Sequence, residues 1–177
     1  MEGPLAGIRV LEVANWLAAP AGCALLADFG ADVIKVEPPN GDPYRGYRPG
    51  PDGRRTTNVA FAADNRGKRA ITLSLDQPGA RDVLYRLVAD ADVFVTNLLP
   101  RRRERYGLTY DDLIHHRPDL IFVSVTGYGQ PADRERSRSA GFVRHVVKPA
   151  DPGELLEIIE EVAAERRTSS PQADAAR

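Results

Sequence analysis

Short runs of apolar residues recur along the first 126 residues of the chain, separated by amphipathic or loop-like segments. The runs are residues 8–14, 31–37, 69–75, 92–96 and 120–126. Runs of this length predict buried strands, and helical segments between them are typical of parallel strands joined by crossovers. The pattern therefore predicts an α/β fold with an open, mainly parallel sheet flanked by helices.

The segments between the runs contain recognisable helix signals. The small-residue stretch 18–30 predicts a helix that ends at Gly30. Residues 76–91 predict a second helix, with Asp76 placed to cap it, and a short third helix is expected around residues 110–116. The Gly- and Pro-rich residues 40–55 predict a long loop.

The composition limits the cellular compartments and the binding partners that we expect for this chain. Lys plus Arg (24) nearly balances Asp plus Glu (25), so no overall field draws the chain to nucleic acid or to a membrane surface. No apolar run approaches the ~20 residues of a spanning helix, and the N-terminus lacks a signal-peptide pattern. Cys23 is the only cysteine, which excludes an intrachain disulfide. We therefore expect a cytoplasmic protein with no nucleic-acid or membrane partner.

Residues at the carboxyl ends of the predicted strands are the first candidates for a site, because open parallel sheets bind ligands there. The small residues from Ala18 to Gly22 allow either close approach of a ligand or tight helix packing. Trp16 could stack on a flat ligand or fill the core, and we favour the core. Cys23 is expected to be a packed small residue rather than a nucleophile.

Two clusters of cations suit an anionic ligand. Residues 65–69 hold three cations just before a strand, which fits a phosphate, although solvation is the commoner fate of such residues. Asn97, at a strand end, is followed by an arginine cluster: Arg101, Arg102, Arg103 and Arg105. Nucleic-acid binding is a competing interpretation, but no row of aromatic residues accompanies the cluster.

Four segments of the chain form an ordered set. They are LAGIRVLEVANWLAAPAGCALLADFGADVIKVEPPNGDPYR, NRGKRAITLSL, ADVFVTNLLP and RYGLTYDDLIHHRPDLIFVSVTGYGQ. In order and spacing they resemble the opening of family III CoA-transferases, which include formyl-CoA transferases and 2-methylacyl-CoA racemases. The resemblance implies a Rossmann-like large domain, a homodimer, and CoA or acyl-CoA as substrate.

Carried over position by position, the resemblance implies CoA contacts at successive strand ends. These positions are Leu17, Ala18, Pro38, Leu73, Ser74, Leu75, Asp76, Asn97, Leu98, Leu99 and Arg105. Leu17 and Pro38 depart from the pattern, because some members have a polar side chain and an arginine there. Asn97 and Arg105 keep the expected chemistry.

The resemblance also implies what the chain lacks. In the family's transferases an Asp carboxylate attacks the acyl-CoA, giving a mixed anhydride and then an aspartyl-CoA thioester. No residue here matches that Asp, and the His-Asp pair of the racemases is missing at residues 141–143. His115 and His116 have no partner at metal-ligand spacing. We therefore expect a chain truncated relative to the family, with no catalytic residue and no metal site.

The character of the sequence changes after residue 130. We expect a partial large domain over residues 1–130, a linker over 131–140, a receiver-like strand and helix over 141–167, and a disordered tail over 168–177. The third part, with its Lys148-Pro149 pair, resembles the end of a response-regulator receiver domain. This points to two fragments joined by a gene fusion, a frameshift or an assembly artefact.

The leading hypothesis is a CoA-binding fragment of a transferase that moves CoA between carboxylic acids. Two alternatives stay open. One is an acyl-CoA racemase of the same family, and the other is a non-catalytic CoA-binding or regulatory fragment.

Overall fold

Strands and helices alternate along the part of the chain that the computed structural model describes, residues 3–47, 58–126 and 144–147. The strands are β1 (Arg9–Val13), β2 (Asp32–Glu37), β3 (Arg69–Thr72), β4 (Val93–Thr96), β5 (Ile121–Thr126) and β6 (Arg144–Val147). The helices are α1 (Ala18–Asp28), α2 (Val59–Asp64), α3 (Ala80–Ala89), α4 (Pro100–Tyr106) and α5 (Tyr110–Ile114), with a 3-10 turn, η1, at Pro43–Gly46. Each apolar run predicted to form a strand contains one.

The strands form one sheet in the order β3-β2-β1-β4-β5-β6, and every neighbouring pair is parallel. The predicted open parallel sheet is confirmed, and its strand order is that of dinucleotide-binding Rossmann folds. After β3 the chain crosses back to the far side of β1 to form β4. The order therefore reverses between β1 and β4, which is where sheets of this kind bind ligands.

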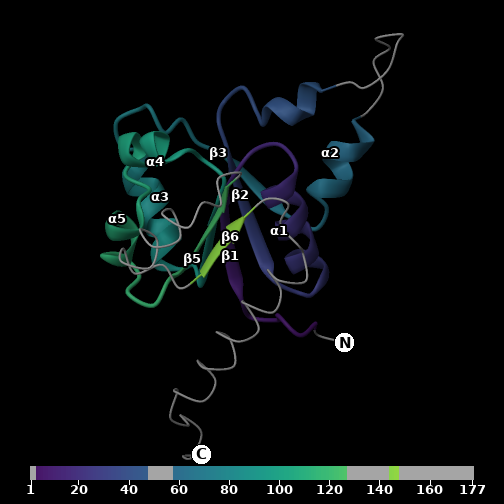
Figure 1. Cartoon of the computed structure of the whole chain (residues 1–177), viewed down its shortest axis with the longest axis horizontal. Coiled ribbons are helices and arrows are strands. Elements are labelled where there is room, and N and C mark those ends of the chain that lie inside the picture. The colour runs from purple at the N-terminus through teal and green to yellow at the C-terminus, as the bar shows by residue number, and fades with distance from the viewer. Residues whose placement is uncertain (1–2, 48–57, 127–143, 148–177) are drawn as a thin grey trace, which may run out of the picture.

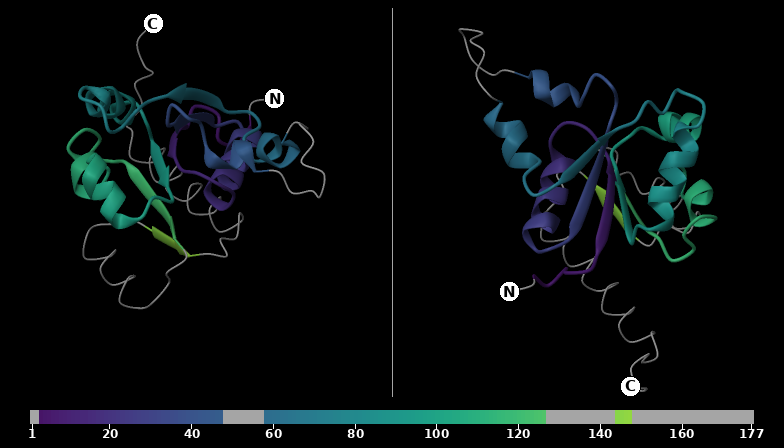
Figure 2. Two further views of the ribbon diagram at one scale, coloured as in Figure 1. Left: turned by 90° about the horizontal axis from the view of Figure 1, so that it is seen from above. Right: turned by 180° about the vertical axis from the view of Figure 1, so that it is seen from behind.

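Helices cover both faces of the sheet, with α1 and α2 on one side and α3, α4 and α5 on the other (Figure 1). Figure 2 shows the same layers from above and from behind. Val10 of β1 belongs to the core under α1, and Leu11 belongs to the core under α3 and α5. Because both faces of β1 are buried, its neighbouring residues Val10 and Leu11 are both apolar, without the alternation of a strand that has one face in water.

Two helices, α2 and α4, go beyond the sequence prediction. Asn58 caps α2, since its side chain accepts a hydrogen bond from the Phe61 N–H at 2.9 Å. Pro100 begins α4, and Gly107 follows it with a φ of 67°. The arginine-rich segment is therefore helical.

The prediction that Asp76 caps the second long helix is wrong. α3 begins at Ala80, and its N-cap is Gly79, which has a φ of 79°. The left-handed turn at Gly79 redirects the chain first, so Asp76 lies in the preceding turn. There its carboxylate pairs with Arg105.

The strand predicted within residues 141–167 is present as β6, and it pairs with β5 in parallel. Part of the segment predicted to be receiver-like thus continues the sheet. The predicted linker 131–140, the helix that follows Lys148-Pro149 and the tail 168–177 lie outside the described residues. Within the described ranges no helix has the length and apolar character to cross a membrane.

Candidate functional site

A cavity of about 310 Å³ opens at the carboxyl ends of β1, β2 and β4, beside the point where the strand order reverses. Its wall combines apolar side chains with a few polar groups. The lining residues are Val13, Ala14, Asn15, Val36, Glu37, Pro38, Pro39, Asn40, Leu73, Ser74, Leu75, Asp76, Leu98, Arg102 and Tyr106. An apolar cleft with a few polar groups at this edge is the usual form of a ligand site in such sheets.

The eleven positions carried over from the family divide into two groups. Those that line the cavity are Pro38, Leu73, Ser74, Leu75, Asp76 and Leu98. Those that do not line it are Leu17, Ala18, Asn97, Leu99 and Arg105. Asn97 and Arg105 contact lining residues directly, while Leu17 and Leu99 are 51% and 61% exposed.

The Asn97 side chain ties the ends of β1 and β4 together. Its Oδ1 accepts a hydrogen bond from the Asn15 N–H at 3.0 Å, and its Nδ2 donates to the Asn15 carbonyl at 2.6 Å. One layer deeper, the Thr96 hydroxyl donates to the Val13 carbonyl at 2.8 Å. Asn97 therefore holds the ends of β1 and β4 together at the switch point, the place where the strand order reverses, and fixes Asn15 in the wall of the cavity.

Arg105 and Asp76, both carried over as CoA contacts, form an ion pair with each other. Their side chains are 69% and 49% exposed, so the pair lies at the protein surface, and Asp76 belongs to the cavity wall. Exposed pairs of this kind contribute little stability. A ligand phosphate could therefore replace Asp76 as the partner of Arg105 with little loss in the free energy of unfolding.

The other arginines of α4 lie in different surroundings. Arg102 lines the cavity and has no carboxylate partner among the described residues. Arg103 lies against β5, where its guanidinium donates to Ser124 Oγ at 3.3 Å and sits 5.7 Å from the centre of the Phe122 ring. Burial lowers the pKa of Arg103. Within the predicted arginine cluster, Arg102 is thus the cation that faces the cavity.

The three cations of residues 65–69 are held by the protein's own carboxylates. Arg66 pairs with Asp28, Lys68 with Glu12, and Arg69 with Asp32. A phosphate would have to displace a carboxylate from each of them. The pairing favours a structural role for this segment over a phosphate site.

Sequence reasoning missed a buried ionic cluster between the sheet and α1. One Glu12 oxygen lies 2.7 Å from Lys35 Nζ, and the other lies 2.7 Å from Lys68 Nζ. Asp42 adds a second carboxylate, 3.0 Å from Lys35 Nζ. All four side chains are at most 2% exposed. The available signal was the charged residues Glu12 and Lys35 inside apolar strand runs, because a buried charge needs a partner.

The pKa values of titratable groups in and beside this cluster are shifted in different directions. Burial lowers the pKa of Lys35, but Glu12 and Asp42 outweigh burial, and the net pKa is raised. Burial dominates for Lys68, whose pKa is lowered despite Glu12. Burial, followed by the Glu12 charge, raises the pKa of the Cys23 thiol well above its usual value. Cys23 therefore stays protonated inside the core, as a packed residue rather than a nucleophile.

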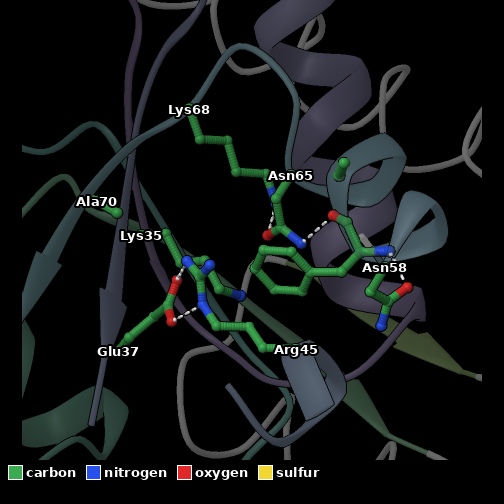
Figure 3. Close-up of a pocket in the computed structure, with 9 residues that line it drawn as sticks. Lys35, Glu37, Arg45, Asn58, Asn65, Lys68 and Ala70 are labelled. Atoms are coloured by element: carbon green, nitrogen blue, oxygen red, sulfur yellow. Dashed lines mark hydrogen bonds and ion pairs between the residues drawn. The ribbon is translucent and has the colours of Figure 1, made fainter. Parts of the chain in front are cut away.

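A second cavity, of about 400 Å³, lies between α2 and the β2–β3 part of the sheet (Figure 3). Polar side chains that line it are already hydrogen-bonded within the protein. Lys68 Nζ donates to the Pro20 carbonyl and to Asn65. Asn58 Nδ2 donates to the Tyr44 and Tyr47 carbonyls. None of the eleven carried-over positions lines this cavity.

Glu37 lines both cavities. It accepts hydrogen bonds from Arg45 Nε and Nη2, both at 2.7 Å, and from the Asp42 N–H at 3.0 Å. Burial opposes the charge on Glu37, but the hydrogen bonds from Arg45 and Asp42 outweigh it and hold the pKa of Glu37 below its usual value. A carboxylate engaged in this way is a poor nucleophile. Across the described ranges no group of three or more His, Cys, Asp or Glu residues is placed to hold a metal ion.

The expectation that Trp16 fills the core is wrong, because its side chain is 47% exposed. Its ring lies 6.0 Å from that of Tyr44 and 6.2 Å from that of Tyr47. The chain leaves β1 in a turn at this residue, so the indole lies on the surface instead of packing under α1.

The amino-acid sequence is 44% identical over 132 residues to the succinate–glutarate CoA-transferase of Agrobacterium fabrum, covering 72% of this chain and 33% of that protein. It is 39% identical over 127 residues to the cinnamoyl-CoA:phenyllactate CoA-transferase of Clostridium sporogenes, covering 70% of this chain and 31% of that protein. The chain thus spans about a third of the length of these relatives.

The fold and the family pattern agree with these relatives. The structure superposes on a CaiB/BaiF family protein from Brucella suis with a TM-score of 0.73 and 32% identity, covering 97% of this chain and 52% of that one. The sequence model of CoA-transferase family III matches residues 5–145, which extends into the segment predicted to be receiver-like. The chain therefore belongs to CoA-transferase family III.

Proposed function

We propose that this chain supplies the CoA-binding edge of an enzyme that transfers CoA between carboxylic acids, with CoA or acyl-CoA as its substrate. The observation that carries the proposal is the cavity at the β1–β4 switch point, whose wall includes six positions carried over from the family as CoA contacts. Relatives named as CoA-transferases support transfer over the racemase alternative.

The chemistry of the cavity suits parts of CoA. Leu73, Leu75 and Leu98 offer apolar surface to an adenine ring or a pantetheine arm. Arg102 offers a guanidinium without a carboxylate partner among the described residues, which suits a phosphate. Arg105 adds a second cation once Asp76 is displaced.

Because Leu17 and Pro38 depart from the family pattern, recognition of the CoA phosphates falls to Arg102 and Arg105. Neither Leu17 nor Pro38 has a side chain that can donate a hydrogen bond, so at these positions contacts to CoA must be apolar or come from the backbone. We therefore expect phosphate recognition to depend on α4 rather than on the loop after β2.

The carboxylates of the cavity do not favour catalysis by the described residues. Glu37 is bound by Arg45, and Asp76 is bound by Arg105. This observation favours a second proposal for the chain by itself, a CoA-binding module without acyl exchange. For the family's full reaction we propose a cytoplasmic homodimer, as the family resemblance implies.

Isothermal titration of the purified chain with CoA tests the binding proposal. The Arg102→Ala variant should bind CoA about tenfold more weakly, because it loses a charge-assisted hydrogen bond to a phosphate. Arg101→Ala is the matched control, since Arg101 belongs to the same helix but does not line the cavity. Equal affinity in both variants, or no binding by the wild-type chain, would contradict the proposed site.

An acyl-exchange assay on the same preparation separates the two proposals. The module proposal predicts CoA binding without transfer of CoA from a donor acyl-CoA to an acceptor acid. Turnover by the chain alone would instead require a nucleophile within it, and would reject the module proposal.

A further inference from the structure

The backbone at Trp16 is unusual. Its φ is 67°, and Trp16 is the only non-glycine residue with a positive φ within the described residues. A bulky side chain disfavours this left-handed conformation, so the surrounding structure must hold it in place. The turn follows Ala14 and Asn15, which line the cavity, and it precedes α1.

A single carboxylate holds the Trp16 backbone. Asp42 Oδ1 accepts hydrogen bonds from the Trp16 N–H at 3.1 Å and from the Tyr44 N–H at 2.9 Å. Asp42 thereby links the turn after β1 to η1, and its side chain is fully buried. The link spans 26 residues of sequence, so it fixes the relative placement of two separate loops.

The other Asp42 oxygen is anchored in the buried ionic cluster. Lys35 Nζ lies 3.0 Å from Asp42 Oδ2, and it also donates to Glu12 Oε1 at 2.7 Å and to the Ala14 carbonyl at 2.9 Å. The Lys35 ammonium thus donates two hydrogen bonds and forms an ion pair with Asp42 Oδ2, which has no hydrogen-bond partner among the described residues. Asp42 therefore cannot rotate away from Trp16 without leaving Lys35 short of a buried partner.

We propose that Asp42 is a positioning residue for the CoA-binding edge: its carboxylate, anchored by Lys35, keeps the Trp16 backbone left-handed and so sets how the chain passes from β1 past the cavity into α1. The functional part of this inference rests on the proposed CoA site. The conformational part stands on its own and has its own readout, because Trp16 is the only tryptophan of the chain.

The Asp42→Asn variant tests the proposal with almost no change in shape. A carboxamide has one acceptor oxygen, so it cannot serve both the backbone N–H groups and the Lys35 ammonium. We expect Trp16 fluorescence to shift in its emission maximum and to be quenched more strongly by acrylamide. We also expect the affinity for CoA to fall about tenfold. Asp28→Asn is the control, because Asp28 pairs with Arg66 at the opposite end of α1 and should change neither readout.

Each result decides a part of the proposal. Unchanged Trp16 fluorescence in Asp42→Asn would overturn the conformational role. Altered fluorescence with unchanged CoA affinity would overturn the role at the binding edge. If the wild-type chain does not bind CoA, the proposed function fails, while the fluorescence comparison still decides the conformational role.

Two further measurements guard against a variant that fails to fold. In the wild-type chain, the Trp16 amide should exchange slowly with solvent even though the indole is half-exposed, and rapid exchange would overturn the proposal. In a Trp16→Gly background, where a positive φ needs no restraint, Asp42→Asn should reduce CoA affinity less than it does in the wild type. An equal reduction in both backgrounds would assign Asp42 a general structural role instead.

Discussion

The Glu12 carboxylate and the Lys35 ammonium lie 2.7 Å apart where their side chains are 0% and 1% exposed. Glu12→Gln keeps the shape of the side chain but removes the carboxylate charge that Lys35 and Lys68 share. Breaking a buried pair from one side costs about 3–5 kcal/mol, so we expect a loss of this size in the free energy of unfolding. Urea denaturation followed by circular dichroism measures it, with Glu104→Gln as the exposed control. A loss no larger than in the control would show that the cluster is solvated.

The partly buried side chain of Arg103 predicts a stabilising substitution. Its Nε is buried and has no hydrogen-bond partner among the described residues, while the guanidinium lies over Phe122. Arg103→Leu removes the desolvated charge and keeps apolar contact with the ring, so we expect a gain of about 1 kcal/mol in the free energy of unfolding. The midpoint of thermal unfolding should rise in Arg103→Leu and stay constant in Arg101→Leu. A lower midpoint would mean that the hydrogen bond to Ser124 and the contact with Phe122 outweigh the cost of desolvating the charge.

The two hydrogen bonds between Asn97 and Asn15 predict how much stability each substitution of Asn97 will cost. Asn97→Ala removes both hydrogen bonds to the Asn15 backbone and should cost about 1–3 kcal/mol of stability. Asn97→Asp keeps an acceptor for the Asn15 N–H but has no donor for the Asn15 carbonyl, so its loss should be at least as large at neutral pH. Chemical denaturation of both variants, beside Asn40→Ala at an exposed position, measures the difference. If all three variants match the wild type, Asn97 does not brace the strands.

Glu37 predicts a specific pH dependence of stability. Burial of Glu37 opposes its charge, but the Arg45 and Asp42 hydrogen bonds prevail, so its folded-state pKa is below the usual value of 4.5. The stability that this shift contributes is present above about pH 4.5 and is lost as the pH falls through the folded-state pKa. Glu37→Gln should therefore flatten the decline of stability in the acid range. Denaturation curves at neutral and acid pH in both proteins check this, and identical slopes would contradict it.

The fold was largely accessible from the sequence because its strands are buried on both faces. The neighbouring residues Val33 and Ile34 are both apolar because they belong to different cores, and adjacent apolar residues of this kind are easy to recognise. The α2 helix was missed because its six residues have no buried side chain, so no amphipathic pattern marks it.

The site was only partly accessible. The family pattern carried residues such as Ser74 and Leu98 to the cavity, since strand ends are ordered by topology. The patterns of side-chain pairing were not accessible, because Asp76 and Arg105 are 29 residues apart and meet only once the chain has crossed the sheet. The hydrogen bond from the Trp16 N–H to the Asp42 carboxylate likewise joins residues 26 apart in the sequence.

The parallel sheet also gives the chain two rims with different features. The amino-end rim carries three ion pairs: Arg9 with Asp32, Arg69 with Asp32, and Arg117 with Asp92. The cavity opens at the other rim. For a biosensor, a tether or dye attached at the amino-end rim would therefore hold the chain on a support with its cavity facing the sample.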